Sequence, residues 1–252
     1  MKFGICTSID NLEKALNAGA DYIEVGNTAL CKLSDGDFEK AAAIADSFPG
    51  KILACNGLFP GDIRLTGENQ SDKIVPWLEK SVSRLARVGV KNIVFGSGSA
   101  RNCPEGFPME KAFEQIVQIA RITADLSKPH GMTIVIEPLR AEETNIIHTA
   151  ADSCNVAKQG ARDNIRGHVD FYHFMQGGEK LRDLIPCIPL LGHVHIASPV
   201  KRSMPTFDDC ADYKAFLSAL RSGGYDGLVS FEGKKPDSWE LIAEYFSFIK
   251  SL

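Results

Sequence analysis

Short runs of β-branched and other apolar residues alternate along the chain with longer segments in which apolar residues recur every three or four positions. The first pattern predicts strands, and the second predicts amphipathic helices. The expected strands are 2–7, 22–27, 52–58, 92–97, 133–138, 165–171, 190–197 and 228–233. The expected helices are 10–18, 37–48, 71–88, 109–130, 148–159, 178–185, 210–222 and 238–251.

The strict alternation of eight strands with eight helices favours one architecture. Strands that are each followed by a helix build a parallel sheet, and eight such units close into a (β/α)8 TIM barrel. The length of 252 residues suits one such barrel, so we expect residues 1–252 to form a single TIM-barrel domain of the α/β class. The helix over 71–88 has an apolar stripe at helical spacing, and Gly89 supplies its stop.

Composition narrows the class of protein. Apolar residues make up 44% of the chain and charged residues 24%, which is ordinary for a soluble globular protein. The formal net charge of −4 argues against nucleic acid as a partner, because nucleic-acid binding needs a basic surface. No apolar run approaches the ~20 residues that a membrane span requires, so we expect no membrane partner.

The cysteines and the N-terminal segment bear on the cellular compartment. Seven cysteines, an odd number without a Cys-x-x-Cys pair, favour reduced thiols over a disulfide framework. The first residues run directly into an expected strand and show no long apolar signal region. We therefore expect a cytoplasmic protein.

Four side chains that can bind a metal stand at the ends of four successive apolar runs in the second half of the chain. They are Glu137, Asp170, His195 and Glu232. Their spacing of about 25 to 37 residues is that of one strand, one helix and two loops. A chain that returns to the same edge once per unit brings all four to one point. Three carboxylates and one imidazole make an oxygen-rich site suited to Mn²⁺, Mg²⁺ or a similar divalent ion.

The motifs around these side chains resemble those of the xylose-isomerase-like barrel superfamily of sugar isomerases and epimerases. They read Ile-Val-Ile-Glu-Pro, His-Val-Asp-Phe-Tyr-His, Gly-His-Val-His-Ile and Val-Ser-Phe-Glu-Gly. They are closest to the ketose 3-epimerase, hydroxypyruvate isomerase and inosose dehydratase branch. The resemblance covers the full length, but it is specific only from about residue 133 onward.

The resemblance implies a metal centre and a catalytic pair. It implies that Glu137, Asp170, His195 and Glu232, from strands 5 to 8, bind one divalent metal ion. Mn²⁺ is the first choice, and Mg²⁺, Co²⁺ or Zn²⁺ are alternatives. It also implies that Glu137 and Glu232 act as the catalytic acid and base in addition to binding the metal.

The chemistry of such enzymes explains these residue types. A divalent metal that holds the carbonyl and hydroxyl oxygens of a sugar stabilises the enediolate formed when the α-proton leaves. One carboxylate is then needed as base, and a second on the opposite face if configuration is to invert. The resemblance therefore implies a metal-dependent sugar or sugar phosphate isomerase or epimerase with a small carbohydrate substrate. An inosose-type dehydratase begins with the same proton abstraction, and the sequence does not separate the two.

Substrate-binding residues follow from the same resemblance. His173 and Glu143 lie where the epimerases keep substrate-binding side chains. The offset of a substrate-contacting arginine falls on Lys201, and Arg202 is the next residue. Lysine carries a compact charge, whereas the planar guanidinium of arginine can donate two parallel hydrogen bonds, so the two are not equivalent. Residues 138–145 depart from the corresponding epimerase segment, which weakens a specific claim to ketohexoses.

Other polar residues admit two interpretations. His193 shares a strand face with His195, so it either orients a ligand or substrate or is an ordinary interior histidine. Glu24 is expected to be structural or to orient a ligand, because a buried glutamate must be paired or coordinated. Asn56 is expected to line the pocket mouth. Arg101 ends a Gly-Ser-Gly-Ser-Ala-Arg segment that either holds a substrate phosphate or is an ordinary loop.

The sequence also bears on two further function classes and on the oligomeric state. Apurinic endonucleases share this barrel but use a multi-metal cluster with extra histidines on strands 3 and 4. Here those strand ends carry Asn56 and, at 95–97, Phe-Gly-Ser. A non-catalytic carbohydrate-binding barrel would not need to retain all four ligands. The resemblance also implies a homo-oligomer, although no segment of the sequence marks an interface.

Overall fold

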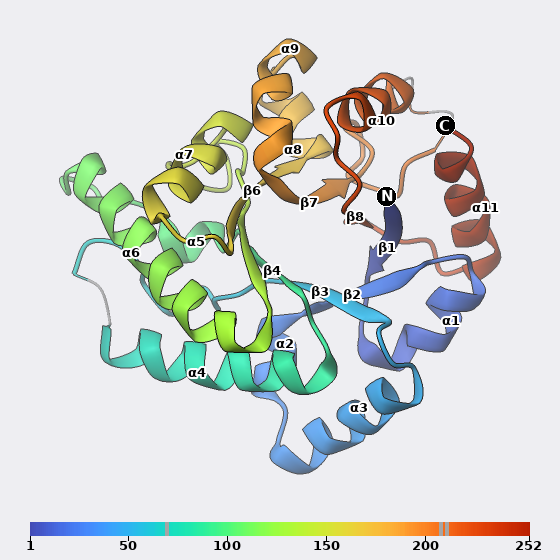
Figure 1. Ribbon diagram of the computed structural model, residues 1–252, viewed down its shortest axis with the longest axis horizontal. Coiled ribbons are helices and arrows are strands. Elements are labelled where there is room, and N and C mark those ends of the chain that lie inside the picture. Colours follow the sequence, from blue (N-terminus) through green and yellow to red (C-terminus); the bar gives the residue numbers. More distant parts are fainter. Residues whose placement is uncertain (69–70, 207–208, 210–211) are drawn as a thin grey trace.

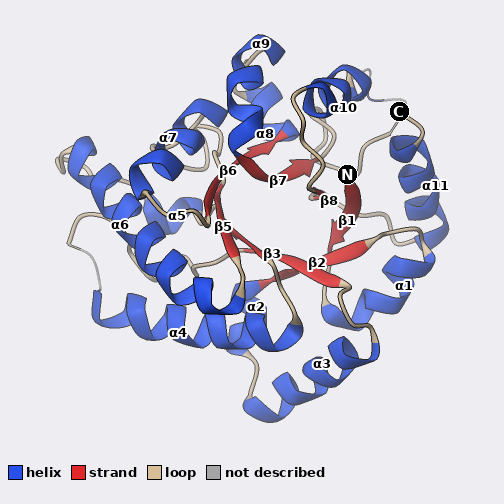
Figure 2. Ribbon diagram, viewed as in Figure 1, coloured by secondary structure: helices blue, strands red, loops and turns tan. Residues whose placement is uncertain are grey.

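Eight parallel strands form a closed barrel in which spatial order follows sequence order, from β1 to β8. The computed structural model describes residues 1–68, 71–206, 209 and 212–252. Figure 1 and Figure 2 show the strands at the centre and the helices around them. The barrel closes where β1 pairs with β8, with Phe3 opposite Val229 and Ile5 opposite Phe231. The predicted (β/α)8 TIM barrel is thereby confirmed.

The strands are short, and every expected one is present. They are β1 Lys2–Cys6, β2 Tyr22–Gly26, β3 Ile52–Asn56, β4 Asn92–Phe95, β5 Thr133–Ile136, β6 Ile165–Asp170, β7 Leu191–Ile196 and β8 Leu228–Phe231. Each ends one or two residues earlier than predicted, because the chain leaves the ladder as it turns into the loops at the barrel mouth. Glu137 and Glu232 are consequently the first residues beyond β5 and β8.

The expected helices are present around the barrel. They are α1 Leu12–Asn17, α3 Asp35–Ser47, α4 Ser71–Val88, α6 Met109–Ser127, α7 Ala150–Gly160, α9 Leu181–Leu184, α10 Tyr213–Ser222 and α11 Trp239–Lys250. The first two residues of the expected helix 210–222 lie outside the described residues. Within the described chain, no helix combines the length and the apolar character that crossing a membrane requires.

Three further short helices and three 3₁₀ turns are defined within the described residues. The helices are α2 Asn27–Lys32, α5 Gly98–Arg101 and α8 Phe171–Gln176, and the turns are η1 Ile9–Asn11, η2 Lys128–His130 and η3 Ile185–Leu190. None of the three helices was predicted, because each is only four to six residues long and lies just after a strand, where a loop was expected. All three helices follow a strand closely at the carboxyl end of the barrel.

Helix α8 begins directly at the end of β6, and this junction fixes the side chain of Asp170. Oδ1 of Asp170 accepts the backbone N–H groups of Tyr172 at 2.6 Å and His173 at 3.3 Å. A side chain that caps a helix in this way satisfies N–H groups that have no partner within the helix. The cap therefore orients the carboxylate, whose second oxygen has no hydrogen-bond partner among the described residues.

Candidate metal centre

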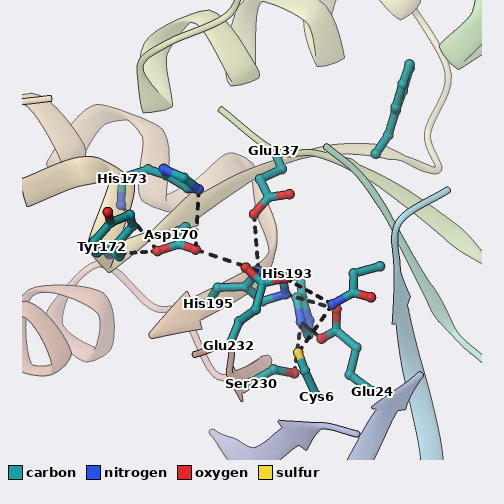
Figure 3. Close-up of polar contacts among 12 residues, drawn as sticks. Cys6, Glu24, Glu137, Asp170, Tyr172, His173, His193, His195, Ser230 and Glu232 are labelled. Carbon is teal, nitrogen blue, oxygen red and sulfur yellow. Dashed lines mark hydrogen bonds and ion pairs between the residues drawn. The ribbon is translucent and has the colours of Figure 1, made fainter. Parts of the chain in front are cut away.

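Glu137, Asp170, His195 and Glu232 converge at the carboxyl end of the barrel (Figure 3). One ligand atom from each side chain lies within 4.8 Å of the others. The four residues come from the ends of β5, β6, β7 and β8, which are neighbours in the barrel. Because parallel strands deliver their carboxyl ends to the same face, residues distant in sequence meet at one point.

His195 lies at the centre of this cluster. Its Nδ1 is 3.2 Å from Oε1 of Glu137, 3.5 Å from Oε2 of Glu232 and 3.9 Å from Oδ2 of Asp170. Its Nε2 is 3.0 Å from Oε1 of Glu24. Burial alone would lower the pKa of His195, but the charges of Glu24 and Glu232 raise it well above its usual value. The imidazole thus provides positive charge among several carboxylates.

The carboxyl groups of the cluster are close enough to disturb one another. Burial and the charge of Glu232 raise the pKa of Asp170 to about 7, and the same two causes raise the pKa of Glu137. Burial would also raise the pKa of Glu232, but His195 and Arg202 hold it at about 2. Burial and mutual repulsion thus disfavour the charged forms of Glu137 and Asp170, and a divalent cation beside them would favour those forms.

The chemistry of Asp170 tests whether a metal fits these residues. Its Oδ2 is buried and has no hydrogen-bond partner among the described residues, whereas Oδ1 caps α8. A buried carboxylate oxygen without a partner is costly, so its retention calls for a ligand. Three carboxylates and one imidazole are a donor set for a hard divalent cation. The residues present therefore fit such an ion.

A buried hydrogen-bonded chain lies beneath the cluster. Glu24, on β2, receives Nε2 of His195 at 3.0 Å on one oxygen and Nε2 of His193 at 2.9 Å on the other. Oγ of Ser230 is 3.2 Å from Nε2 of His193 and 2.7 Å from the hydroxyl of Tyr22. Burial would raise the pKa of Glu24, but His195 and His193 hold it well below its usual value. His193 thus contacts the side chain that orients His195.

Glu24→Gln is expected to weaken Mn²⁺ binding by about 10- to 100-fold, because it removes the charge that holds the ring of His195. Calorimetric titration of the purified variant with Mn²⁺ measures the effect. Glu179→Gln is a matched control, since Glu179 accepts a bond from the backbone N–H of Ala150 and takes no part in the cluster. Equal Mn²⁺ affinity in wild type and Glu24→Gln would show that the charge of Glu24 does not contribute to Mn²⁺ binding.

Several predicted substrate-binding side chains contact one another and Glu232. Nη1 of Arg202 donates to Oε1 of Glu143 at 2.7 Å. Its Nη2 lies 3.3 Å from Nε2 of His173 and 3.5 Å from Oε2 of Glu232. The guanidinium also lies over the ring of Tyr172, 4.9 Å from the ring centre. These contacts join the predicted substrate-binding residues to the predicted metal ligands.

The structure distinguishes Arg202 from Lys201. Arg202 has a φ of +47°, and its carbonyl oxygen accepts the N–H of Lys234 at 2.7 Å. This turn carries its side chain back over the cluster. Lys201 is exposed, and its backbone N–H bonds Oγ of Ser198 at 3.3 Å. The side chain that reaches Glu232 is therefore one residue beyond the motif offset.

Asn56 contacts the cluster through its side chain, whereas the side chain of Arg101 is buried against backbone carbonyl groups. Asn56 ends β3, and its Nδ2 donates to Oε1 of Glu232 at 3.0 Å. Arg101 is fully buried, and its guanidinium donates to the carbonyl oxygens of Glu137 at 2.7 Å and Phe95 at 3.3 Å. An arginine so enclosed offers no surface to a phosphate. Its predicted substrate-binding role does not fit this position, and we correct it to a structural role.

Two residues near the cluster were not predicted. Cys6 ends β1, and its thiol groups with His195 and Glu232 as a second set of potential metal ligands within 4.8 Å. His168 is fully buried, and neither ring nitrogen has a partner among the described residues. His168 stands two positions before Asp170, so the period of a strand could have placed it on the inner face. The sequence gives no comparable signal for Cys6.

Comparisons with known proteins agree on one family. The family model described as xylose isomerase-like TIM barrel matches residues 12–252. The putative hydroxypyruvate isomerase of Xenopus laevis is 25% identical over 88% of this chain and 83% of its own length. D-psicose 3-epimerase of Agrobacterium fabrum is also 25% identical, over 88% of this chain and 77% of its own. The apo crystal structure of 3-keto-D-glucoside 4-epimerase from E. coli has a TM-score of 0.85 at 20% identity, covering 100% of both chains, which is a likeness of fold.

Proposed function

Because the chain belongs to the xylose isomerase-like TIM barrel family, we propose that it is a divalent-metal-dependent isomerase or epimerase of a small sugar or sugar phosphate. The observation that carries the proposal is the convergence of three carboxylates and one imidazole at the barrel mouth. The sequence relatives support the class of reaction, since one is named a hydroxypyruvate isomerase and another a D-psicose 3-epimerase.

Glu137, Asp170, His195 and Glu232 would hold the ion, with Mn²⁺ as the first choice. When bound, the ion supplies a Lewis acid that stabilises negative charge on the substrate oxygens while the α-proton is away. The cluster provides four ligands for a single ion. Asn56 at the end of β3 adds an amide rather than a histidine, so the described residues favour one ion over the multi-metal cluster of an apurinic endonuclease.

Glu137 and Glu232 are the groups that move the proton in this proposal. One carboxylate removes the proton beside the carbonyl, and the other returns a proton to the opposite face when configuration inverts. The side chain of Glu232 is 22% exposed and that of Glu137 is 7% exposed. Glu232 is therefore the more accessible of the two carboxylates, and Glu137 is the more buried. The amide of Asn56 and the guanidinium of Arg202 orient Glu232.

His173 and Arg202 bind the substrate hydroxyls in this proposal. Burial and the neighbouring Arg202 charge lower the pKa of His173 to about 3, so its imidazole is neutral at pH 7. A neutral imidazole both donates and accepts a hydrogen bond, as recognition of a hydroxyl group requires. Glu143 fixes the guanidinium of Arg202 at 2.7 Å and contributes to the same wall.

His173→Ala is expected to lower kcat/KM by about tenfold, the equivalent of about one lost hydrogen bond. The metal content should not change, because His173 lies outside the four-ligand group. Steady-state kinetics and elemental analysis of the same preparation measure the two quantities. Loss of metal together with activity would assign His173 to the ligands instead.

The decisive experiment is proton exchange in D₂O with added Mn²⁺, followed by NMR. The panel consists of ketoses, ketose phosphates and inososes. Metal-dependent loss of one C–H signal is expected, and it identifies the carbon that is deprotonated. The product then separates an epimerase and an isomerase from an inosose-type dehydratase, which shares the first step. Absence of exchange across the panel, with Mn²⁺ bound, would contradict the proposal for these substrates.

A further inference from the structure

Cys6 places a sulfur atom beside the cluster that the proposed function does not use. It is the last residue of β1 and is half-buried. Its thiol, one ring nitrogen of His195 and one carboxylate oxygen of Glu232 lie within 4.8 Å of one another. In the view of Figure 3, Cys6 and Asp170 lie on opposite sides of His195 and Glu232. The thiol thus borders these two ligands from the side away from Asp170.

In the part of the chain that the structure describes, three groups of potential ligands share His195: one is His168, His193 and His195, and the other two overlap further. Both contain His195 and Glu232, and the first adds Glu137 and Asp170 whereas the second adds Cys6. Among the residues that the structure describes, Cys6 forms no such group with Glu137 and Asp170. An ion bound by the second set would therefore not sit where the first set places its ion, although it would use two of the same side chains.

The position of the thiol is fixed by its surroundings. Nδ2 of Asn56 is 3.4 Å from the Cys6 sulfur and 3.0 Å from Oε1 of Glu232, so one amide contacts both potential ligands. The carbonyl oxygen of Cys6 accepts Nζ of Lys235 at 2.6 Å. Strand β1 is paired with β8, which leads directly into Glu232. Backbone pairing and side-chain contacts together hold the sulfur near this carboxylate.

Sulfur changes which ions the second set prefers. Thiolate is a soft ligand that selects ions such as Zn²⁺, whereas carboxylates suit Mg²⁺ and Mn²⁺. We propose that Cys6, His195 and Glu232 form a second, overlapping site for a thiophilic divalent cation such as Zn²⁺ or Cd²⁺. On binding, the thiol proton leaves to water and the sulfur forms a coordinate bond to the cation.

The second site regulates the first by competition. A cation held by Cys6 takes His195 and Glu232 away from the four-ligand set, so the two ions exclude each other and turnover stops. This consequence for turnover rests on the proposed function, whereas the binding itself does not. Since His195 and Glu232 are shared, Cys6 is the residue whose removal separates the two sites.

Cys6→Ser tests the proposal with Cd²⁺ and Mn²⁺ as probes on the full-length protein. Wild type is expected to show a near-ultraviolet sulfur-to-Cd²⁺ charge-transfer band on titration with Cd²⁺. Cys6→Ser should lose the band and bind Cd²⁺ at least about tenfold more weakly, equivalent to about 1.4 kcal/mol. Its Mn²⁺ affinity should stay unchanged, because Cys6 is outside the four-ligand set. Circular dichroism checks that the variant is folded.

Cys154→Ser is the matched control, since Cys154 is a buried free cysteine on α7 outside both ligand sets. It should keep the band and both affinities. A Cd²⁺ band or an unaltered Cd²⁺ affinity in Cys6→Ser would overturn the proposal.

Mn²⁺ release, followed by electron paramagnetic resonance as Cd²⁺ is added, tests the competition. Wild type should release Mn²⁺, and Cys6→Ser should release it only at higher Cd²⁺ concentration. Simultaneous binding of both ions would overturn the overlap. The protein could show the Cys6-dependent band but neither bind Mn²⁺ nor exchange substrate protons. That result would support the sulfur site and contradict the proposed function. Mn²⁺ binding and proton exchange without the band would support the proposed function and contradict the sulfur site.

Discussion

Replacing Glu137 by glutamine is expected to lower turnover by at least about a hundredfold while the barrel stays folded. General acid–base groups contribute about 10²–10⁴-fold, and in the proposed function this residue also contributes a negative charge to the metal site. Glutamine keeps the shape of the side chain, and the backbone carbonyl of residue 137 still accepts Arg101. Glu232→Gln is expected to behave in the same way, because Glu232 is the other carboxylate of the proposed acid–base pair.

The measurement is kcat at saturating Mn²⁺ together with a thermal melt of each variant. Glu179→Gln again serves as the control for the same chemical change away from the cluster. The expected pattern is a melting temperature close to wild type and a collapse of turnover in only the two cluster variants. A cluster variant that retains more than about a tenth of the wild-type rate would contradict the assigned catalytic role.

Gly96→Ala is expected to remove metal binding and turnover nearly as completely as the change at Glu137. Gly96 is the first residue after β4, and a Cβ atom there would lie 2.1 Å from Oε2 of Glu137 and 3.2 Å from its Cδ. Atoms do not approach so closely, so the carboxylate must rotate away from the cluster. The end of a glutamate side chain moves easily. We therefore expect a larger effect on metal binding and turnover than on the stability of the fold.

Gly26→Ala is the matched control for this prediction. Gly26 ends β2 at the same mouth of the barrel, and its added Cβ would meet its nearest neighbours, Ala29 and Asn56, at 3.9 Å. Calorimetric titration with Mn²⁺ and steady-state kinetics compare the two alanine variants. Gly96→Ala should lose about a hundredfold in kcat/KM, as for loss of one acid–base group, and Gly26→Ala should remain near wild type. Full Mn²⁺ affinity in Gly96→Ala would mean that Glu137 does not need its present position.

The barrel could be predicted because its pattern is repeated and each repeat is long enough to read. Helix α4 runs over Ser71–Val88, as expected from its apolar stripe and the glycine that follows. The short helices α2, α5 and α8 escaped prediction because each lies just after a strand, where a loop was expected. Helix α8 owes its start to the cap that Asp170 provides, a contact that depends on where β6 ends.

The four predicted metal ligands do converge, because each stands at the end of a strand and the fold gathers those ends. The neighbouring residues were harder to predict. Arg101 follows a glycine- and serine-rich segment typical of anion sites, yet its guanidinium turns back onto backbone carbonyls. The contact of Arg202 with Glu232 depends on a positive φ at Arg202, which the sequence does not predict. Cys6 approaches Glu232 only because the first and last strands pair.

The pairing of β1 with β8 also determines the stage of folding at which the four-residue cluster forms. The bonds that complete it join residues far apart in sequence: Asn56 and Glu232 differ by 176 in residue number, and Glu24 and His195 differ by 171. A chain synthesised from its N-terminus exposes seven strands before β8 and the following Glu232 emerge, so the four side chains come together only when the barrel closes and do not direct its early steps. Until β8 docks, β1 and β7 are open edges. The nascent chain is therefore most exposed to aggregation just before it gains its ligand site.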